Sequence, residues 1–308
     1  MFMVCGESLM DVFVTAETPT GAMLDARIGG SPLNVAIGLA RLGQAVNFLG
    51  ALSTDRLGQR LRRALLQEGV GLAHAQTVDA PTTLGMVGLD AEGAAAYTFY
   101  GHGGADRQLQ FAGLTEFEPG AAGLHVGSYA MLVEPIAATL RSLIERERLR
   151  CVVAYDPNLR LNVEPDIRAW REAVAWTVAR AHLVKASAED VALLYPGMPL
   201  DAVAAAWLRR GAAVVVITCG GLGARGFIPG AQVQIEATSV ALVDSVGAGD
   251  SFQAAVLTWL AEHGQLSIAA LTRLPETCLH AALSFAARAA ALTCARRGAD
   301  LPWRSELA

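Results

Sequence analysis

Short unbroken apolar runs alternate with longer amphipathic segments along this chain, and this rhythm limits the fold more than any other feature. The segments between the runs, such as 33–43, 135–149 and 201–211, have the residue spacing of helices with one apolar face. Strands that are apolar at successive positions are buried on both faces, as in parallel sheets. The sequence therefore predicts an α/β fold, with helices on both faces of a mostly parallel, doubly wound sheet. The expected strands are 2–6, 45–52, 124–128, 151–156, 182–187 and 213–218.

Two regions depart from this rhythm. Residues 11–30 are strand-like and rich in turn residues, and residues 82–100 alternate in polarity and resemble a hairpin. Antiparallel pieces inserted into a parallel fold often form a lid or flap. Because the sequence shows no linker and no internal repeat, we expect one domain over 1–308 with a small β-strand lid contributed by about 11–30 and 82–107.

The composition excludes several classes of protein. The chain is 53% hydrophobic and 17% charged, which suits a large core and excludes a disordered chain. Its net charge of -5 gives no basic patch of the kind that nucleic acid requires. The cysteine number is odd, no C-x-x-C occurs, and the histidines never fall at H-x-x-x-H spacing. We therefore expect reduced thiols and no cysteine or histidine metal site.

Membrane insertion and export are not expected either. The longest apolar helix-like run, 281–295, contains Arg288 and is short for a bilayer span. Met1 leads directly into an apolar strand, without the pattern of a signal peptide. We expect a cytoplasmic protein that binds neither membrane nor nucleic acid.

The segment "GLGARG" (221–226) matches the glycine pattern of dinucleotide-binding proteins and follows an expected strand. In such a site the turn opens a helix, whose N-terminus holds the pyrophosphate. Here Pro229 and Gly230 break any helix, and "QVQIEA" alternates like a strand. The context therefore argues against a nicotinamide cofactor and against an NAD-dependent oxidoreductase.

The segment "DSVGAGDSF" (244–252) combines a glycine-rich turn with an aspartate. An amphipathic helical pattern follows it, so Gly247, Ala248 and Gly249 are expected at or just before a helix N-terminus. Free N–H groups and the helix dipole favour an anion there. Asp250 has two readings: an acid that stabilises the helix N-terminus, or a general base beside an anion hole, as phosphoryl transfer requires.

With these residues the chain resembles the ribokinase-like (PfkB) family of carbohydrate kinases. "DSVGAGDSF" resembles the C-terminal signature of the family, and "GGSPLNVAIGLARLG" (29–43) resembles the N-terminal one. "DPNLR" (156–160), "VKASAED" (184–190) and "VITCGGLG" (216–223) match further landmarks in order, and "GESLMDVF" and "RRGADLPW" are similar to bacterial fructokinases. The resemblance covers essentially the whole chain. It implies the three-layer ribokinase-like fold and ATP-dependent phosphorylation of a sugar hydroxyl, with fructose as the first choice.

The resemblance also implies roles for individual residues. Asp250 would be the base, and Gly247, Ala248 and Gly249 the anion hole for the transferred phosphoryl group. The residues implied at the sugar are Asp11, Gly29, Gly30, Asn34 and Arg160, with the two glycines also forming the hinge of the lid. The residues implied at the nucleotide are Lys185, Ser187, Thr218, Gly220 and Gly223.

The resemblance implies ATP and Mg²⁺ as cofactors, and K⁺ as an activator in some relatives. The family's N-x-x-E element appears here as Ser187 and Asp190, so Asp190 would act on magnesium indirectly. Asp244 and Val246 would lie at the potassium site, where the ligand from Val246 would be its backbone carbonyl.

The stretch "YTFYGHGGADRQL" (97–109) bears on the substrate. Kinases of 2-keto-3-deoxygluconate resemble it but place an arginine at the position of Gly101, where it would grip a carboxylate. Arg107 or His102 would be the substitute here. Phe99 would either cover the sugar or pack within the lid.

Several readings of function remain open. A neutral sugar, fructose, is favoured, with 2-keto-3-deoxygluconate kinase and ribokinase as alternatives. A sugar or nucleotide sensor of the same fold is the non-enzyme alternative, and the presence of Asp250 and of the G-A-G turn favours the enzyme. The sequence itself does not indicate an oligomeric state, and the family resemblance alone implies a homodimer formed through the lid.

Overall fold

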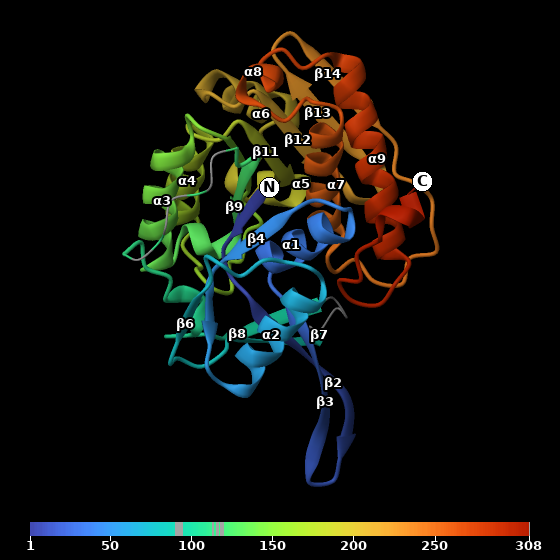
Figure 1. Ribbon diagram of the computed structural model, residues 1–308. Coiled ribbons are helices and arrows are strands. Elements are labelled where there is room, and N and C mark those ends of the chain that lie inside the picture. The colour runs from blue at the N-terminus through green and yellow to red at the C-terminus, as the bar shows by residue number, and fades with distance from the viewer. Residues whose placement is uncertain (90–94, 113, 115–116, 118–119, 308) are drawn as a thin grey trace.

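The computed structural model describes residues 1–89, 95–112, 114, 117 and 120–307 (Figure 1). Its central sheet runs parallel from β4 to β12, and β13 and β14 extend it as an antiparallel hairpin at one edge. The strand order is β14 (Ala231–Ile235), β13 (Ala224–Ile228), β12 (Val214–Thr218), β11 (Leu183–Ser187), β10 (Val152–Asp156), β9 (Gly123–Gly127), β1 (Phe2–Cys5) and β4 (Val46–Leu49).

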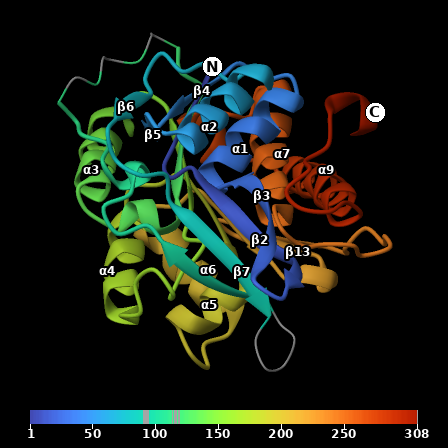
Figure 2. The same cartoon turned by 90° about the horizontal axis from the view of Figure 1, so that it is seen from below.

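The central sheet is buried on both faces, which explains the unbroken apolar runs. In β1, Phe2 and Val4 belong to one apolar core, and Met3 and Cys5 belong to the other. Figure 2 shows the helices in two layers on either side of the sheet. The first core is covered by α1 (Ser31–Arg41), α2 (Arg56–Gln67), α7 (Ala248–Glu262), α8 (Ile268–Leu271) and α9 (Glu276–Cys294). The second is covered by α3 (Ile136–Glu147), α4 (Ile167–Val178), α5 (Ala188–Leu194) and α6 (Leu200–Arg210). The predicted α/β fold with a mostly parallel sheet is confirmed.

A second, four-stranded sheet follows directly from the carboxyl end of β1. Its order is β3 (Gly21–Gly29), β2 (Leu9–Thr18), β7 (Leu84–Leu89) and β8 (Ala95–Tyr100). β2 and β3 form a hairpin that projects away from the rest of the molecule (Figure 1). Both regions that departed from the α/β rhythm are therefore antiparallel hairpins of one small sheet.

The expected strand 45–52 is divided. β4 ends at Leu49, and β5 (Ala51–Ser53) pairs instead with β6 (Gln76–Val78) in a separate two-stranded sheet. Gly50 lies at the break, where a Cβ would approach the carbonyl oxygen of Gly6 to 2.7 Å. The predicted single strand was wrong because the chain bends where it passes the end of β1.

The glycine pattern at 221–226 opens no helix. A short 3-10 turn, η3 (Gly220–Leu222), joins β12 to β13, and β13 pairs antiparallel with β14. The remaining short turns are η1 (Ala105–Arg107), η2 (Ser128–Met131) and η4 (Arg304–Leu307). The argument from Pro229 and Gly230 against a dinucleotide turn is confirmed.

Within the described residues, α9 is the one helix whose length and composition would suit a membrane span. Half of that apolar segment is buried inside the protein. Leu279, Leu283 and Phe285 belong to the core beneath it. The apolar character of α9 is therefore accounted for by the core that it covers.

The strand order reverses at β1. The next central strand along the chain, β4, pairs with one side of β1, and the strand after that, β9, pairs with the other side. This makes β1 a topological switch point. In open α/β sheets, ligands bind outside the carboxyl ends of the strands at such a point. α1 begins there after Gly30, which has φ 106°, and Gly247, with φ 80°, precedes α7. Both conformations favour glycine.

Candidate active site

Polar side chains follow the carboxyl ends of the central strands. Glu7 comes just after β1, Asp156 ends β10, and Ser187 ends β11 directly beside Thr218 at the end of β12. The second sheet adds Asp11, whose carboxylate is close enough to Asp250 for each charge to affect the other. Residues far apart in the sequence thus meet at one edge of the sheet.

Asp250 is the third residue of α7, and two side chains of α1 hold its carboxylate. Ser31 Oγ donates to Asp250 Oδ1 at 2.6 Å, and Asn34 Nδ2 donates to Oδ2 at 2.8 Å. The carboxylate is buried, with 8% of the residue exposed. A helix-terminal acid needs no donors from another helix, so its stabilising effect on α7 does not account for this arrangement.

The turn before Asp250 offers fewer free N–H groups than its sequence suggested. The N–H of Ala248 donates to the Ser245 carbonyl at 3.2 Å. Within the described chain, the N–H groups of Gly247 and Gly249 have no backbone acceptor. The expected set of three amides is therefore reduced to two, because the left-handed Gly247 closes a turn on Ser245.

A lysine from another strand stands beside this turn. Lys185 Nζ lies 2.6 Å from Asp156 Oδ2, in a buried ion pair. A Cβ added to Gly249 would lie 3.0 Å from the same Nζ. The glycine-rich turn has no lysine of its own, yet the fold supplies one from β11.

The ion pair keeps its charges although it is buried. Burial acts to lower the pKa of Lys185, but the Asp156, Asp250 and Asp190 carboxylates outweigh it and hold that pKa above its usual value. Burial raises the pKa of Asp156 to about 6, against the opposing effect of Lys185. Asp156 Oδ1 accepts no hydrogen bond from the described residues.

The Asp11 carboxylate lies beside glycines on the two strands that flank β2: Gly29 on β3 and Gly85 on β7. A Cβ on Gly29 would overlap the Asp11 carboxylate, and one on Gly85 would lie 3.0 Å from Oδ1. Burial raises the pKa of Asp11 to about 6, and the Arg160 guanidinium partly opposes this. Gly29 therefore makes room for Asp11, whereas Gly30 is required by its φ of 106° and by the nearby Glu7 carbonyl.

The charge of Arg160 reaches the carboxyl groups of Asp11 and Glu7. Its Nη1 donates to the Leu159 carbonyl at 2.8 Å and to the Asn158 carbonyl at 3.5 Å. Arg160 thus joins the group at the strand ends through its charge.

Ser187 and Asp190 form the start of α5. Ser187 Oγ accepts from the Asp190 N–H at 2.9 Å, and the Asp190 carboxylate accepts from the Ser187 N–H at 3.4 Å. Asp190 Oδ1 also accepts from the Leu159 N–H at 3.0 Å. This pair is a capping box, which accounts for the residue types at both positions.

The nucleotide-site candidates at the end of β12 differ in their local requirements. Thr218 Oγ1 donates to the Ala186 carbonyl at 3.4 Å, and Gly220, with φ 55°, faces open space. Gly223 has φ 90°, and a Cβ there would overlap the Ile235 carbonyl oxygen. Gly223 is therefore required by the β12–β13 turn, whatever binds nearby.

Asp244 ties two loops together. Its Oδ1 accepts from the Val246 N–H at 3.0 Å, and its Oδ2 accepts from the Gly298 N–H at 2.8 Å. Across the described ranges, no group of three or more Asp, Glu, His or Cys side chains could hold a metal ion. Any cation bound here would need backbone, water or ligand oxygens.

Phe99 and Arg107 meet at a buried ring. Phe99 packs edge-on against Tyr129, with ring centroids 6.0 Å apart, and the Arg107 guanidinium lies 5.7 Å from the Tyr129 centroid. Tyr129 donates to Asp106 Oδ2 at 2.9 Å. A Cβ on Gly101 would lie 3.1 Å from Arg107 Nη2, so the Arg107 guanidinium lies directly beside Gly101.

Sequence reasoning missed Ser31, Glu7 and Asp156. Asp156 and Glu7 could have been found, because each polar residue directly follows an apolar strand that the sequence identifies. Ser31 gave no such signal, since its contact with Asp250 spans 219 residues of sequence.

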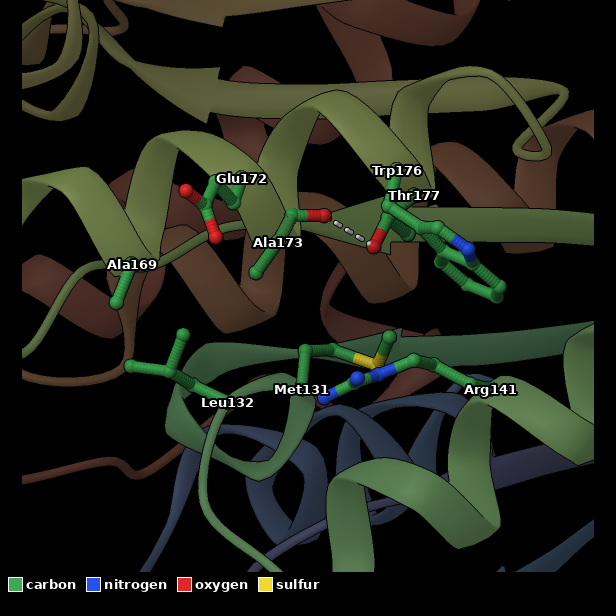
Figure 3. A pocket seen from close by; sticks show the side chains of 8 residues that line it. All are labelled: Met131, Leu132, Arg141, Ala169, Glu172, Ala173, Trp176 and Thr177. Carbon is green, nitrogen blue, oxygen red and sulfur yellow. Dashed lines mark hydrogen bonds between the residues drawn. The ribbon is translucent and has the colours of Figure 1, made fainter.

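A separate pocket of about 310 Å³ lies between η2, α3 and α4 (Figure 3). Met131, Leu132 and Trp176 are apolar residues that line it, and Arg141 and Glu172 are charged residues of the same lining. It contains none of the residues gathered around Asp250, so it is not the site built at the strand ends.

Comparison with known proteins agrees with this geometry. The family model described as "pfkB family carbohydrate kinase" matches residues 1–306. A fructokinase of Rhizobium leguminosarum bv. trifolii is 32% identical over 91% of this chain and 85% of its own length.

Solved structures give the same picture. Fructokinase from Xylella fastidiosa with bound ATP superposes with a TM-score of 0.92 at 26% identity, covering 99% of this chain and 96% of that one. Fructokinase from Vibrio cholerae O395 was solved with fructose, ADP and calcium ion (TM-score 0.86, 26% identity, 99% and 97% coverage). A double mutant of it was solved with fructose, ADP and potassium ion (TM-score 0.87, 26% identity, 99% and 96% coverage).

Proposed function

Because this chain belongs to the pfkB family of carbohydrate kinases, we propose that it transfers the γ-phosphoryl group of ATP to the 6-hydroxyl of fructose. The observation that carries this proposal is the meeting of Asp250, the Gly247–Gly249 turn and Lys185 at the carboxyl edge of the sheet. A base, an anion site and a cation are the parts that phosphoryl transfer needs.

In the proposed reaction, Asp250 accepts the proton of the sugar hydroxyl. The hydroxyl oxygen forms a bond to the γ-phosphorus while the bond to the leaving ADP oxygen breaks. The N–H groups of Gly247 and Gly249 and the Lys185 ammonium face the transferred group and stabilise the charge that it carries. The turn and the carboxylate act on different atoms: the turn faces the phosphoryl group, and Asp250 faces the sugar hydroxyl.

Sugar binding is assigned to residues that surround Asp250. Asp11 accepts hydrogen bonds from sugar hydroxyls and Arg160 donates to them, with Gly29, Gly30 and Asn34 lining the same side. Asn34 would also keep its bond to Asp250 Oδ2. We propose that the second sheet is a lid over this sugar, with Phe99 beneath it against Tyr129.

ATP is assigned to the ends of β11 and β12. Thr218, Gly220 and Gly223 would place backbone groups at its phosphates and ribose, and Lys185 would reach the phosphate nearest Asp250. The magnesium that accompanies ATP would supply charge neutralisation. Asp156 Oδ1, which accepts no hydrogen bond from the described residues, would hold a water of this ion, and Asp190 would act on it indirectly from its place near Lys185.

A potassium site is proposed between the loops that Asp244 joins. Its carboxylate holds the backbone at Val246 and Gly298 in place, so carbonyl oxygens of these loops can be presented to one cation. Potassium activation of fructose turnover, lost in Asp244→Ala, is the expected result.

A second substrate is supported by Arg107. Its Nε is buried and has no hydrogen-bond partner among the described residues. Asp106, beside it, is engaged by Thr83 and Tyr129. A buried guanidinium with one nitrogen free to donate suits an acidic sugar such as 2-keto-3-deoxygluconate.

We also propose that the protein forms a homodimer through the second sheet and acts in the cytoplasm, where ATP is abundant. The exposed Val14, Met23 and Leu24 on the β2–β3 hairpin support the dimer, since a projecting apolar hairpin favours burial against a partner.

An ATP-coupled assay with fructose, 2-keto-3-deoxygluconate, ribose and adenosine tests the substrate. The highest kcat/KM is expected with fructose. Preference for 2-keto-3-deoxygluconate that disappears in Arg107→Met would establish the second candidate. ATP binding without turnover of any sugar would instead support a sensor.

A further inference from the structure

Ser31 donates a hydrogen bond to the proposed base, and its position in α1 gives the hydroxyl no other structural task. Ser31 is the first residue of α1, and Gly30 is its N-cap, with no side-chain capping bond. The Ser31 hydroxyl donates to Asp250 Oδ1 at 2.6 Å, a distance typical of a hydroxyl bound to a charged oxygen. The residue is buried, with 9% exposed.

The two donors from α1 act as a pair. Ser31 and Asn34 are three residues apart, so they share one face of the helix. One binds Oδ1 and the other binds Oδ2. Together they fix the plane of the Asp250 carboxylate and leave each oxygen one further acceptor position.

Charged groups also face Asp250 from three other elements. Asp11 on β2 and Asp156 at the end of β10 interact with it as like charges. Lys185 on β11 interacts with opposite charge. The donors of α1 are neutral, so they bind the Asp250 carboxylate without adding charge to this group of side chains.

We infer that Ser31 is a positioning residue for phosphoryl transfer: its hydroxyl binds the Asp250 carboxylate and holds it oriented toward the attacking sugar hydroxyl. This inference rests on the proposed kinase function. In the reaction the proton moves from the sugar hydroxyl to Asp250, the new oxygen–phosphorus bond forms and the bond to ADP breaks. Ser31 keeps its own proton throughout.

The Ser31→Ala variant tests this role. A hydrogen bond to a charged group is worth about 1.5–3 kcal/mol, so kcat with fructose should fall roughly 10- to 100-fold at pH 7. KM for ATP should stay unchanged. The acidic limb of the kcat–pH profile should move upward by about one pH unit, because the ionised carboxylate has lost a donor.

Two further variants control for packing. Ser31→Thr keeps a hydroxyl at the same position and should restore both kcat and the acidic limb. Ser142→Ala removes a hydroxyl that donates to a backbone carbonyl on α3, far from the site, and should leave both unchanged.

A measurement without turnover separates this inference from the proposed function. Infrared titration of the ligand-free protein, with Asp250→Asn subtracted, isolates the carboxyl signal of Asp250. Its midpoint should move to higher pH in Ser31→Ala. If the wild type fails to phosphorylate fructose and the midpoint still moves, the proposed function fails and the role of Ser31 stands. An unmoved midpoint in Ser31→Ala would overturn the inference. The inference would also fail if Ser31→Ala lost activity without a shift of its acidic limb and Ser31→Thr did not restore that activity.

Discussion

At the scale of single residues, the absence of a side chain at Gly249 lets Lys185 approach the turn that we propose as the phosphoryl site. The backbone of Gly249 is helical, so alanine fits its conformation, and the one close neighbour of an added Cβ is Lys185 Nζ at 3.0 Å. The nearby Lys185 ammonium, and not the backbone conformation, therefore explains why residue 249 is a glycine.

Gly249→Ala should accordingly separate activity from stability. The free energy of unfolding should hold or rise by about 0.5–1 kcal/mol, since alanine favours a helix. The displaced ammonium should lower kcat on the order of tenfold or more. Gly21→Ala, where an added Cβ meets only an ordinary contact, is the control. Unchanged kcat in Gly249→Ala would place Lys185 outside the reaction.

Glu7 gives the protein a pH dependence of stability. Burial raises the pKa of Glu7 to about 8, from a usual value of 4.5. The folded state therefore binds a proton more tightly than the unfolded state, and stability is lost as pH rises from about 4.5 through 8.

Glu7→Gln, which cannot ionise, should have a flatter stability profile over this range. The difference from wild type should approach ~1.4 kcal/mol per pH unit between pH 5 and 8. Urea unfolding of both proteins across that range measures it. Parallel profiles would show that Glu7 is not protonated in the folded protein.

At the scale of elements, the crossing of α1 and α7 builds the site. Gly38 of α1 faces α7, where an added Cβ would lie 2.8 Å from Ala254 Cβ and 2.6 Å from Leu301 Cδ2. The close crossing brings the first turn of α1 to the first turn of α7, where Ser31 and Asn34 reach Asp250.

Gly38→Ala should therefore cost stability although alanine is the better helix former. Overpacking in a close helix contact costs about 1–3 kcal/mol, and kcat should fall together with stability because α1 shifts. Chemical denaturation and the fructose assay measure the two effects. A variant as stable and as active as wild type would show that the crossing is not tightly packed.

Sequence patterns predicted the helices and strands better than the contacts between them. The apolar runs marked β1 and β9–β12, because a strand buried on both faces is apolar at successive positions. The G-A-G turn marked the start of α7. The approach of Lys185 to Gly249 left no local trace, since it depends on which strand lies beneath the helix. Hence the resemblance to known kinases named most of the site, while the contact of Ser31 with Asp250 appeared only in three dimensions.

At the scale of the whole molecule, two sheets meet at the carboxyl end of β1. The central sheet carries Asp156 and Lys185, and the second sheet brings Asp11 near Asp250. The end of the β2–β3 hairpin extends past this contact and exposes apolar residues, with Val14 directly opposite Leu24. The proposed dimer would cover this surface.

Met23→Glu combined with Leu24→Glu should shift the protein to monomers in sedimentation experiments, because two charges would have to lose water in the interface. Thr20→Glu at the exposed turn of the same hairpin is the control and should leave the assembly unchanged. A wild-type protein that sediments as a monomer would contradict the dimer.

The central claim is that Asp250 removes the proton of the attacking sugar hydroxyl. Asp250→Asn keeps the size of the side chain and removes the base, so kcat with fructose should fall by about 10²- to 10⁴-fold. ATP affinity, measured by calorimetry on the same preparation, should remain close to wild type. Wild-type turnover in Asp250→Asn, with ATP binding intact, would contradict the account.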